Sequence, residues 1–206
     1  MSNDPIQIGG RIKKARKAAG LSQTELGERL DKTLRTIQKY ESGEIEPSIA
    51  MINDIARILD TSPAELMGYE KQDLRLNTLS DVLAVLNELN STAGIRFQID
   101  VKRPPNADEW TCSLTFNGND HAAEHNADLC LFLERFADER ERLETYWTDQ
   151  DYYDQWFETE LAYYAGVKLK KKEVETLTRE ERLKRRNALI EEQMANGNHS
   201  ENISGS

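Results

Sequence analysis

The chain has 206 residues, of which 38% are hydrophobic and 31% are charged, and its 37 acidic and 27 basic residues give a formal charge of −10. This apolar content excludes a wholly disordered chain, and the length predicts one or two domains. No apolar run approaches the roughly 18 residues of a membrane helix, and no signal peptide is recognisable after Met1. We therefore expect a cytoplasmic protein without membrane contact.

Charge is distributed unevenly along the sequence. Residues 1–40 carry a net charge of +5, residues 41–69 carry −5, residues 70–166 carry −12 and residues 167–206 carry +2. Exposed charges interact over only about 8 Å at physiological salt, so a short basic segment of an acidic protein can still bind a polyanion. The acidic middle of the chain is not expected to lie against phosphates.

Two helices are predicted at the start of the chain. The spacing of Ile8 and Ile12 is typical of one helical face, and Gly20 supplies a left-handed residue at which the helix ends. Ser22 with Glu25 three residues later forms the capping-box pattern of a second helix.

A tight turn leads to a third helix. Asp31 and Lys32 form the turn, Thr33 is the expected N-cap, and the helix ends at Ser42-Gly43. Two short helices joined so tightly must cross steeply, as in a helix-turn-helix. Further helices are predicted after Ser48 and after Ser62. The expected inward residues of the second to fourth helices are Leu26, Leu30, Ile37, Tyr40, Ile49, Ile52, Ile55, Ala56 and Leu59.

These motifs resemble the Cro/C1-type (XRE) helix-turn-helix family over about residues 8–69. The resemblance is carried by Leu21 to Leu26, Thr33 to Gly43, Pro47-Ser48 and Ile55-Ala56. It implies a five-helix, lambda-repressor-like DNA-binding domain at residues 1–69. Two positions depart from the family pattern. Gly27 stands where the family usually has alanine, and this costs about 1 kcal/mol because glycine has a lower helix propensity. Asp31 stands where the family usually has the glycine of the turn, and aspartate tolerates the left-handed conformation.

The predicted recognition helix runs from Thr33 to Ser42, and its N-terminal part faces base edges in the major groove. Arg35 can pair with guanine, Gln38 with adenine, and Leu34 can touch a thymine methyl group. Lys39 reaches either a guanine or a phosphate. The positions that the resemblance assigns to DNA contact, the last of them near the DNA backbone, are Gln23, Thr33, Leu34, Arg35, Thr36, Gln38, Lys39 and Ser42. The alternative is that these are solvated polar residues.

The resemblance also implies a structural ion pair between Arg16 and Glu41, so Arg16 is not expected to bind DNA. The remaining basic residues of the first helix form either a positive rim for phosphates or a solvated face. They are Arg11, Lys13, Lys14 and Lys17.

After a linker at residues 70–77, an acidic α+β domain is predicted at residues 78–166. A helix capped by Thr78 is followed by alternating strands at 95–101 and 110–116, joined by a long loop. A long helix then starts at Asn126, and Thr148 caps another, which gives the order α-β-β-α-α. Two strands alone are marginal, so the hairpin must pack on these helices or pair with another copy.

Three features of this acidic domain leave alternatives open. The aromatic residues of 146–164 form either a core or the lining of a pocket for a cationic ligand or a partner. His121 to His125 matches the H-x-x-E-H pattern of a metallopeptidase, but the surrounding residues favour a loop, so no metal ligands are assigned. Cys112 and Cys130 are expected to be small buried apolar groups in a reducing compartment.

The tail, residues 167–206, is predicted to be a charged helix capped by Thr178 with Glu181 and disordered beyond Ala195. Its basic residues at 170–172 and 182–186 either contact phosphates or form a solvated face.

Taken together, the sequence predicts a sequence-specific DNA-binding transcriptional regulator, not an enzyme, with no cofactor and no catalytic residues. We expect a repressor of a mobile-element, phage-like or stress operon that binds its double-stranded operator as a homodimer. Residues 78–166 would supply dimerisation or bind a small-molecule or protein effector. The alternative is an antitoxin-like or assembly-control interaction module whose DNA binding is secondary.

Overall fold

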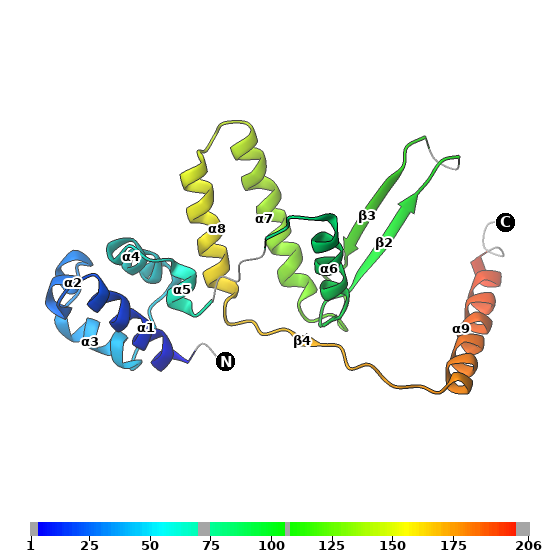
Figure 1. Cartoon of the computed structure of the whole chain (residues 1–206), viewed down its shortest axis with the longest axis horizontal. Coiled ribbons are helices and arrows are strands. Elements are labelled where there is room, and N and C mark those ends of the chain that lie inside the picture. Colours follow the sequence, from blue (N-terminus) through cyan, green and yellow to red (C-terminus); the bar gives the residue numbers. More distant parts are fainter. Residues whose placement is uncertain (1–3, 70–74, 106–107, 201–206) are drawn as a thin grey trace. The chain divides into compact units, whose positions relative to one another are not determined.

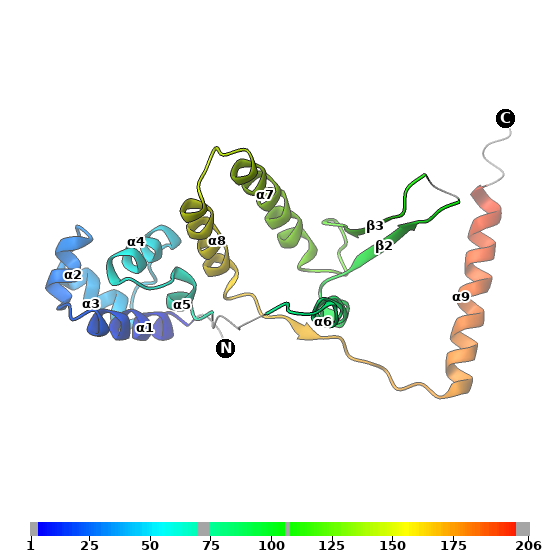
Figure 2. The same cartoon turned by 45° about the horizontal axis from the view of Figure 1, so that its top comes forward.

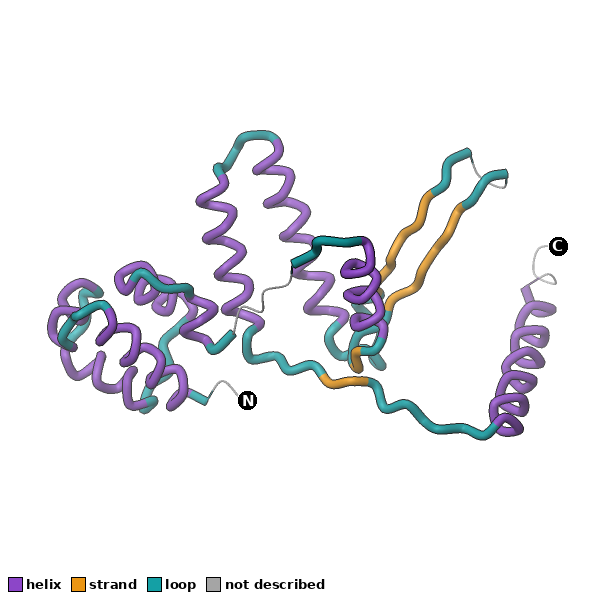
Figure 3. The backbone as a smooth tube through the Cα atoms, viewed as in Figure 1, coloured by secondary structure: helices purple, strands orange, loops and turns teal. Residues whose placement is uncertain are grey.

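The computed structural model describes residues 4–69, 75–105 and 108–200, and the chain divides into two compact units, residues 1–171 and 172–206. The described residues are mostly helical, with two small antiparallel sheets (Figures 1 and 3). None of the helices in these ranges is long and apolar enough to cross a membrane.

Five short helices open the first unit, in the predicted order. They are α1 (Pro5–Ala18), α2 (Gln23–Arg29), α3 (Leu34–Ser42), α4 (Ile49–Leu59) and α5 (Pro63–Met67).

The predicted helix ends are confirmed. Ser22 Oγ accepts a hydrogen bond from Glu25 N at 3.1 Å, and the Glu25 carboxylate accepts one from Ser22 N at 2.7 Å. Gly20 and Asp31 both adopt positive φ, at 70° and 55°, so the aspartate that replaces the family's glycine makes the left-handed turn. The N-caps of α3, α4 and α5 are Thr33, Ser48 and Ser62.

The core of this helical domain consists of the aliphatic residues that the sequence spacing selects. Ile8, Ile12, Leu26, Ile37, Ile52 and Ile55 each expose no more than 1% of their surface, and Leu30, Ala56 and Leu59 are also buried. One member of the same buried cluster comes from far along the chain, since Ala162 is fully buried among them.

Ala162 belongs to α8 (Gln150–Tyr164), which packs against α4 and α5. Leu161 and Ala165 pack beside it, and Ser62 Oγ donates a hydrogen bond to the carboxylate of Glu158. The buried cluster of α1 to α5 therefore includes a residue from the predicted region 78–166. Of the predicted linker, residues 70–74 lie outside the described residues, and residues 75–77 have no regular structure.

The helix α6 (Leu79–Asn90) begins at the predicted cap Thr78. It leads to β1 (Thr92–Ala93), which pairs antiparallel with β4 (Lys170–Lys171). The ammonium of Lys171 also lies 3.2 Å from a carboxylate oxygen of Glu88. This pairing, which the sequence did not predict, joins residues nearly eighty positions apart in the first unit.

Strands β2 (Phe97–Lys102) and β3 (Thr111–Phe116) form the predicted hairpin, with Ile99 opposite Leu114 and Val101 opposite Cys112. Almost all of both strands is exposed, and only Phe97 and Phe116 at the base are half-buried. The prediction that Cys112 is buried is therefore wrong, because nothing among the described residues covers the face to which it belongs.

Asn126 opens α7 (Asn126–Glu144) but does not act as its cap, which is His125. Instead the fully buried Asn126 amide accepts a hydrogen bond from Arg96 N at 3.0 Å and donates to the carbonyls of Arg96 and Asn117, at 2.8 and 3.0 Å. A single side chain thus joins the residues just before β2 and just after β3 to the start of α7.

Figures 1 and 2 show α7 and α8 as neighbouring helices joined by a turn. The cap of α8 is Asp149, whose carboxylate accepts from Tyr152 N at 2.8 Å, so the predicted cap at Thr148 is wrong by one residue. Between the helices, Phe132 stacks on Trp156 with ring centroids 6.4 Å apart.

The second unit contains α9 (Arg179–Ser200). Its predicted cap is confirmed, since Glu181 N donates to Thr178 Oγ1 at 3.3 Å and Thr178 N to the Glu181 carboxylate at 2.7 Å. The helix continues to Ser200, where disorder was predicted beyond Ala195, and residues 201–206 lie outside the described residues.

Candidate nucleic-acid interface

The turn between α2 and α3 fixes how the predicted recognition helix is presented. Lys32 N donates to the Gly27 carbonyl at 2.8 Å, and a Cβ added to Gly27 would lie only 2.7 Å from the Lys32 carbonyl oxygen. From the sequence, Gly27 is expected only to weaken α2. In the structure, the absence of a side chain at Gly27 allows the backbone of Lys32 to approach α2 closely.

One edge of α3 faces outward. Leu34, Arg35 and Gln38 are exposed, with 44% of the Leu34 surface accessible, whereas Ile37 and Glu41 on the opposite side are buried. Arginine, glutamine and an apolar side chain are residue types that contact guanine, adenine and the thymine methyl group in a major groove.

The other predicted contact residues of α3 are held by local hydrogen bonds. Thr33 Oγ1 accepts from Thr36 N at 3.2 Å and lies 2.9 Å from Thr36 Oγ1. Ser42 Oγ donates to the Lys39 carbonyl at 3.2 Å, and Lys39 Nζ lies 2.7 Å from a carboxylate oxygen of Glu44. Exposed ion pairs of this kind contribute little stability, so Lys39 can exchange Glu44 for a phosphate.

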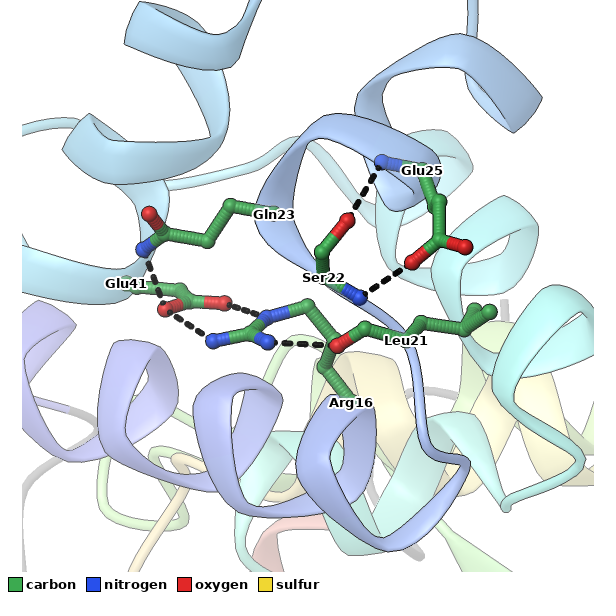
Figure 4. Close-up of polar contacts among 6 residues, drawn as sticks. All are labelled: Arg16, Leu21, Ser22, Gln23, Glu25 and Glu41. Carbon is green, nitrogen blue, oxygen red and sulfur yellow. Dashed lines mark hydrogen bonds and ion pairs between the residues drawn. The ribbon is translucent and has the colours of Figure 1, made fainter.

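Behind this edge lies the ion pair that the resemblance implies (Figure 4). Arg16 and Glu41 expose only 7% and 8% of their surfaces, and Arg16 Nε lies 2.5 Å from Glu41 Oε1. A second guanidinium nitrogen donates to Glu41 Oε2 at 3.1 Å, and the third donates to the Leu21 carbonyl at 2.6 Å. Every guanidinium nitrogen is satisfied, so Arg16 ties α1 to α3 and to the start of α2.

Gln23 joins the same cluster. Its side-chain amide donates to Glu41 Oε2 at 2.8 Å. This residue is a predicted phosphate contact, and the structure adds a second, structural role, since one of its amide N–H groups is engaged with Glu41. A hydrogen bond between Gln23 and Glu41 has no signal in the sequence.

The pair is charged in the folded protein. Burial favours the neutral acid of Glu41, but it is outweighed by hydrogen bonds from Arg16 and Gln23 and by the positive charges of Arg16 and Lys13. The pKa of Glu41 is therefore lowered. The hydrogen bonds that Arg16 donates to Glu41 in turn raise the pKa of Arg16.

A pH dependence follows from the lowered pKa of Glu41. Ionised Glu41 contributes folding stability that is complete above the ordinary value of 4.5 and is lost as the pH falls through the folded-state pKa. We expect the difference in unfolding free energy between the wild type and Glu41→Gln to shrink below pH 4.5. Urea unfolding at a series of pH values measures it. A Glu41→Gln difference that stays flat with pH would contradict the assignment.

The predicted positive rim is smaller than expected. Arg11 is half-buried, and its Nε donates to the Leu66 carbonyl at 2.7 Å, so it satisfies the end of α5 and does not face outward. Its burial lowers its pKa. Lys13, Lys14 and Lys17 are exposed.

The H-x-x-E-H motif lies outside the helices and strands. Residues 121–125 lie in turns, as predicted. Within the described ranges, no three His, Cys, Asp or Glu side chains gather as metal ligands would.

The aromatic residues of 146–164 fall into two groups by their exposure. Half of them are half-buried, and of these Trp156, Phe157 and Tyr164 lie against Phe132 of α7. The other half are exposed, and among them Tyr146 and Trp147 border an open groove of about 790 Å³ with Arg142 and Tyr152.

Comparisons with known proteins find similarity over part of the chain. A helix-turn-helix family model matches residues 12–66. Uncharacterized HTH-type transcriptional regulators of Sinorhizobium medicae and Rhizobium meliloti are each 40% identical over 55 residues, which is 27% of this chain. The chain spans 40% of the length of these curated relatives.

Among solved structures, the restriction-modification controller protein C.AhdI from Aeromonas hydrophila is 32% identical, with 31% of this chain and 91% of that chain covered and a TM-score of 0.30. The residues that the family model matches include α2, α3, α4, Gly27 and both partners of the buried ion pair. Residues 12–66 belong to the Cro/C1-type helix-turn-helix family.

Proposed function

We propose that the protein is a sequence-specific transcriptional regulator that inserts α3 into the major groove of double-stranded DNA. The observation that carries this proposal is the outward edge of α3, where Leu34, Arg35 and Gln38 are exposed while the buried Arg16–Glu41 pair holds the helix from behind. A rigidly held helix edge with these side chains suits direct reading of bases.

Phosphate contacts would orient that edge. Helix N-termini bind phosphate through their first backbone N–H groups, and those at the start of α3, after the cap Thr33, would do so here. Gln23 at the start of α2, together with Lys39 and Ser42 at the end of α3, would extend the contact along the DNA backbone. Because few phosphates are contacted by one domain, affinity should fall only moderately with salt.

Arg35→Ala tests the proposed reading of bases. On duplexes selected from a random library, we expect this variant to lose about 1–3 kcal/mol of binding free energy at one base pair and to tolerate every base there. Competition binding with single-base-pair variants of the selected duplex measures the effect.

Lys14→Ala, which removes an exposed charge of α1, serves as the control. It should weaken binding uniformly across sequences and lower the salt dependence. If Arg35→Ala also weakened all sequences equally, Arg35 would be a phosphate contact and Gln38 would be left as the candidate reader.

We further propose that two copies bind together and repress transcription. A single domain contacts few phosphates, whereas two domains on half-sites about 34 Å apart add their contacts on one face of the duplex. A dimer that occupies an operator excludes other proteins from the same stretch of DNA. A promoter carrying the selected duplex should therefore be less active in cells that express the protein, and equal activity would contradict repression.

A further inference from the structure

The turn between α7 and α8 (Figure 1) is closed by two backbone hydrogen bonds at the end of α7. Trp147 N donates to the Arg142 carbonyl at 2.8 Å, and Tyr146 N donates to the Leu143 carbonyl at 3.2 Å. These are the two bonds of the Schellman motif, in which the residue at the place of Tyr146 is left-handed and is usually glycine. Tyr146 indeed has a φ of 64°. A tyrosine therefore occupies a position that glycine would fill with less strain.

Tyr146 differs from the other non-glycine residues with positive φ in the described part of the chain. These are Asp31 and Asp60, whose short polar side chains tolerate the left-handed conformation. Tyrosine has no such side chain, and 94% of the Tyr146 surface is accessible, so packing within the chain does not explain it. Strained residues of this kind persist where the strain serves a function. The exposed ring of Tyr146 thus points to a contact outside the chain.

Trp147 also lacks a partner of the usual kind. In a Schellman motif the residue at its position commonly packs on an apolar residue in the last turns of the helix. The corresponding residues of α7 are the charged Glu141 and Arg142, and 82% of the Trp147 surface remains accessible. Tyr146, Trp147 and Tyr152 line the open groove of about 790 Å³, here termed the aromatic groove.

The surroundings of the aromatic groove are acidic. Residues 138–154 include seven acidic and two basic residues, which gives a net charge of −5. Both arginines already have acidic partners, since Arg140 lies 3.4 Å from Glu144 and Arg142 lies 2.8 Å from Glu139. An anionic partner, such as a nucleic acid or an acidic protein surface, is therefore repelled, whereas a cationic partner is attracted.

The chain itself shows which cation suits such rings. The guanidinium of Arg142 lies 5.7 Å from the ring centroid of Tyr152, and that of Arg103 lies 4.7 Å from the ring centroid of Trp110. A guanidinium is planar and stacks on aromatic rings, which the ammonium of lysine cannot do, and tryptophan is the best ring partner. Tryptophan, tyrosine and arginine are also the residues that dominate binding at protein–protein interfaces.

We infer that the aromatic groove binds a segment of another protein that presents arginine side chains. Tyr146 and Trp147 stack on its guanidinium groups, and the exposed carboxylates of Glu141 and Asp151 next to the groove balance their charge. The helix α8 starts at this groove and reaches the core of the helical domain at Ala162, so the bound partner is carried by the same compact unit as α3. The inference goes beyond DNA binding and does not depend on it.

Fluorescence anisotropy of labelled octa-arginine, titrated with the full chain at physiological salt and without DNA, tests the groove. We expect saturable binding by the wild type and an affinity about 5- to 30-fold lower for the double variant Tyr146→Gly/Trp147→Ala, which loses two cation–π contacts at unchanged net charge. The matched control is Trp110→Ala, because Trp110 is an exposed tryptophan of the hairpin, accessible over 68% of its surface. It should bind as the wild type does. A wild type that does not bind, an unaffected double variant or an equal loss in Trp110→Ala would each overturn the assignment.

A second pair of variants separates the groove from the overall charge of the chain. Glu141→Gln/Asp151→Asn removes two charges next to the groove and should weaken the binding of octa-arginine. Asp108→Asn/Glu109→Gln removes two charges from exposed residues that precede β3, and it should change the affinity by less than about twofold, because charges interact over only about 8 Å at this salt. Equal losses in the two variants would show that the peptide responds only to net charge, and would overturn the assignment.

Tyr146→Gly alone distinguishes a lost contact from a lost fold. Relief of the left-handed strain should raise the Tm of the chain by about 2–4 °C in thermal unfolding followed by circular dichroism, while the affinity for octa-arginine falls. A lower Tm would mean that contacts within the chain hold Tyr146, and would overturn the assignment.

Two other occupants of the groove are distinguished with the same protein. Acetylated tetra-arginine amide and spermine each carry about four positive charges, and the peptide should displace labelled octa-arginine at the lower concentration. Equal displacement by spermine would assign the groove to a small polyamine. A wild type that self-associates in sedimentation equilibrium while Tyr146→Gly/Trp147→Ala is monomeric would assign it to a second copy. Either result would overturn the assignment, and neither bears on DNA binding, because α3 is unchanged in every variant.

Discussion

Replacing Arg16 by methionine is expected to lower the free energy of unfolding by about 3–5 kcal/mol. Methionine keeps most of the side-chain volume but leaves the Glu41 carboxylate buried with only the Gln23 amide as a hydrogen-bond partner. It also frees the Leu21 carbonyl, which Arg16 now satisfies. Urea unfolding of the full chain, followed by circular dichroism at neutral pH, measures the loss.

The double variant Arg16→Met/Glu41→Leu is the control for this prediction. Removing both charges abolishes the uncompensated carboxylate, so the double variant should recover most of the lost stability and can exceed the wild type. The two single losses would then be far from additive. A double variant as unstable as the sum of the single variants would show that packing, and not the buried charge, explains the effect of Arg16.

Gly9→Ala is expected to destabilise the helical domain by at least about 1–3 kcal/mol. A Cβ at Gly9 would lie 2.3 Å from the backbone oxygen of Tyr40 and 2.7 Å from that of Glu41, so α1 and α3 would have to move apart. Backbone atoms cannot rotate away as a side chain can. The displaced helix is the one that presents Arg35 and Gln38, so the binding of selected duplexes should weaken as well.

The adjacent Gly10 provides a matched control in the same turn of α1. A Cβ there meets nothing within 4 Å, and alanine favours a helix over glycine by about 0.5–1 kcal/mol. Gly10→Ala should therefore raise the unfolding free energy while Gly9→Ala lowers it. If the two variants changed stability in the same direction, the close approach of α1 to α3 would not be what Gly9 permits.

The helical domain could be predicted from its sequence because its signals are local. Capping residues such as Ser22 and Thr33 act within one helical turn, and inward residues such as Ile52 and Ile55 repeat at the helical period. The cap at Ser22, the left-handed Asp31 and the buried Arg16–Glu41 pair are all found in the structure. The prediction of the Arg16–Glu41 ion pair rests on the family resemblance and not on the spacing of the two residues.

What the sequence could not reveal depends on contacts between distant residues. Nothing near Ala162 indicates that it completes the core of α1 to α5, and nothing near Arg11 indicates that the Leu66 carbonyl binds it. The consecutive glycines Gly9-Gly10 are a local signal of such a contact, because two glycines inside a helix need a reason such as the close approach of another backbone. The alternation of apolar residues predicts the two strands of the hairpin, but it predicts neither their register nor whether their apolar face is covered.

In the candidate site too, some features can be predicted from local sequence and others depend on contacts between distant residues. Exposure of Leu34, Arg35 and Gln38 follows from helical period alone, since Ile37 fixes the inward side. The engagement of Gln23 with Glu41 and of Lys39 with Glu44 depends on the tertiary arrangement and on side-chain rotamers. The outward edge of α3 is therefore predictable from the sequence, whereas the contacts of Gln23 and Lys39 are not.

Selection of bound duplexes from a random-sequence pool by the full chain, in dilute buffer, tests most directly whether the outer edge of α3 reads DNA. The wild type should enrich a defined short sequence, and the double variant Arg35→Ala/Gln38→Ala should bind duplexes without enriching it. A wild type that retains no duplex, or a double variant that enriches the same sequence, would contradict the account.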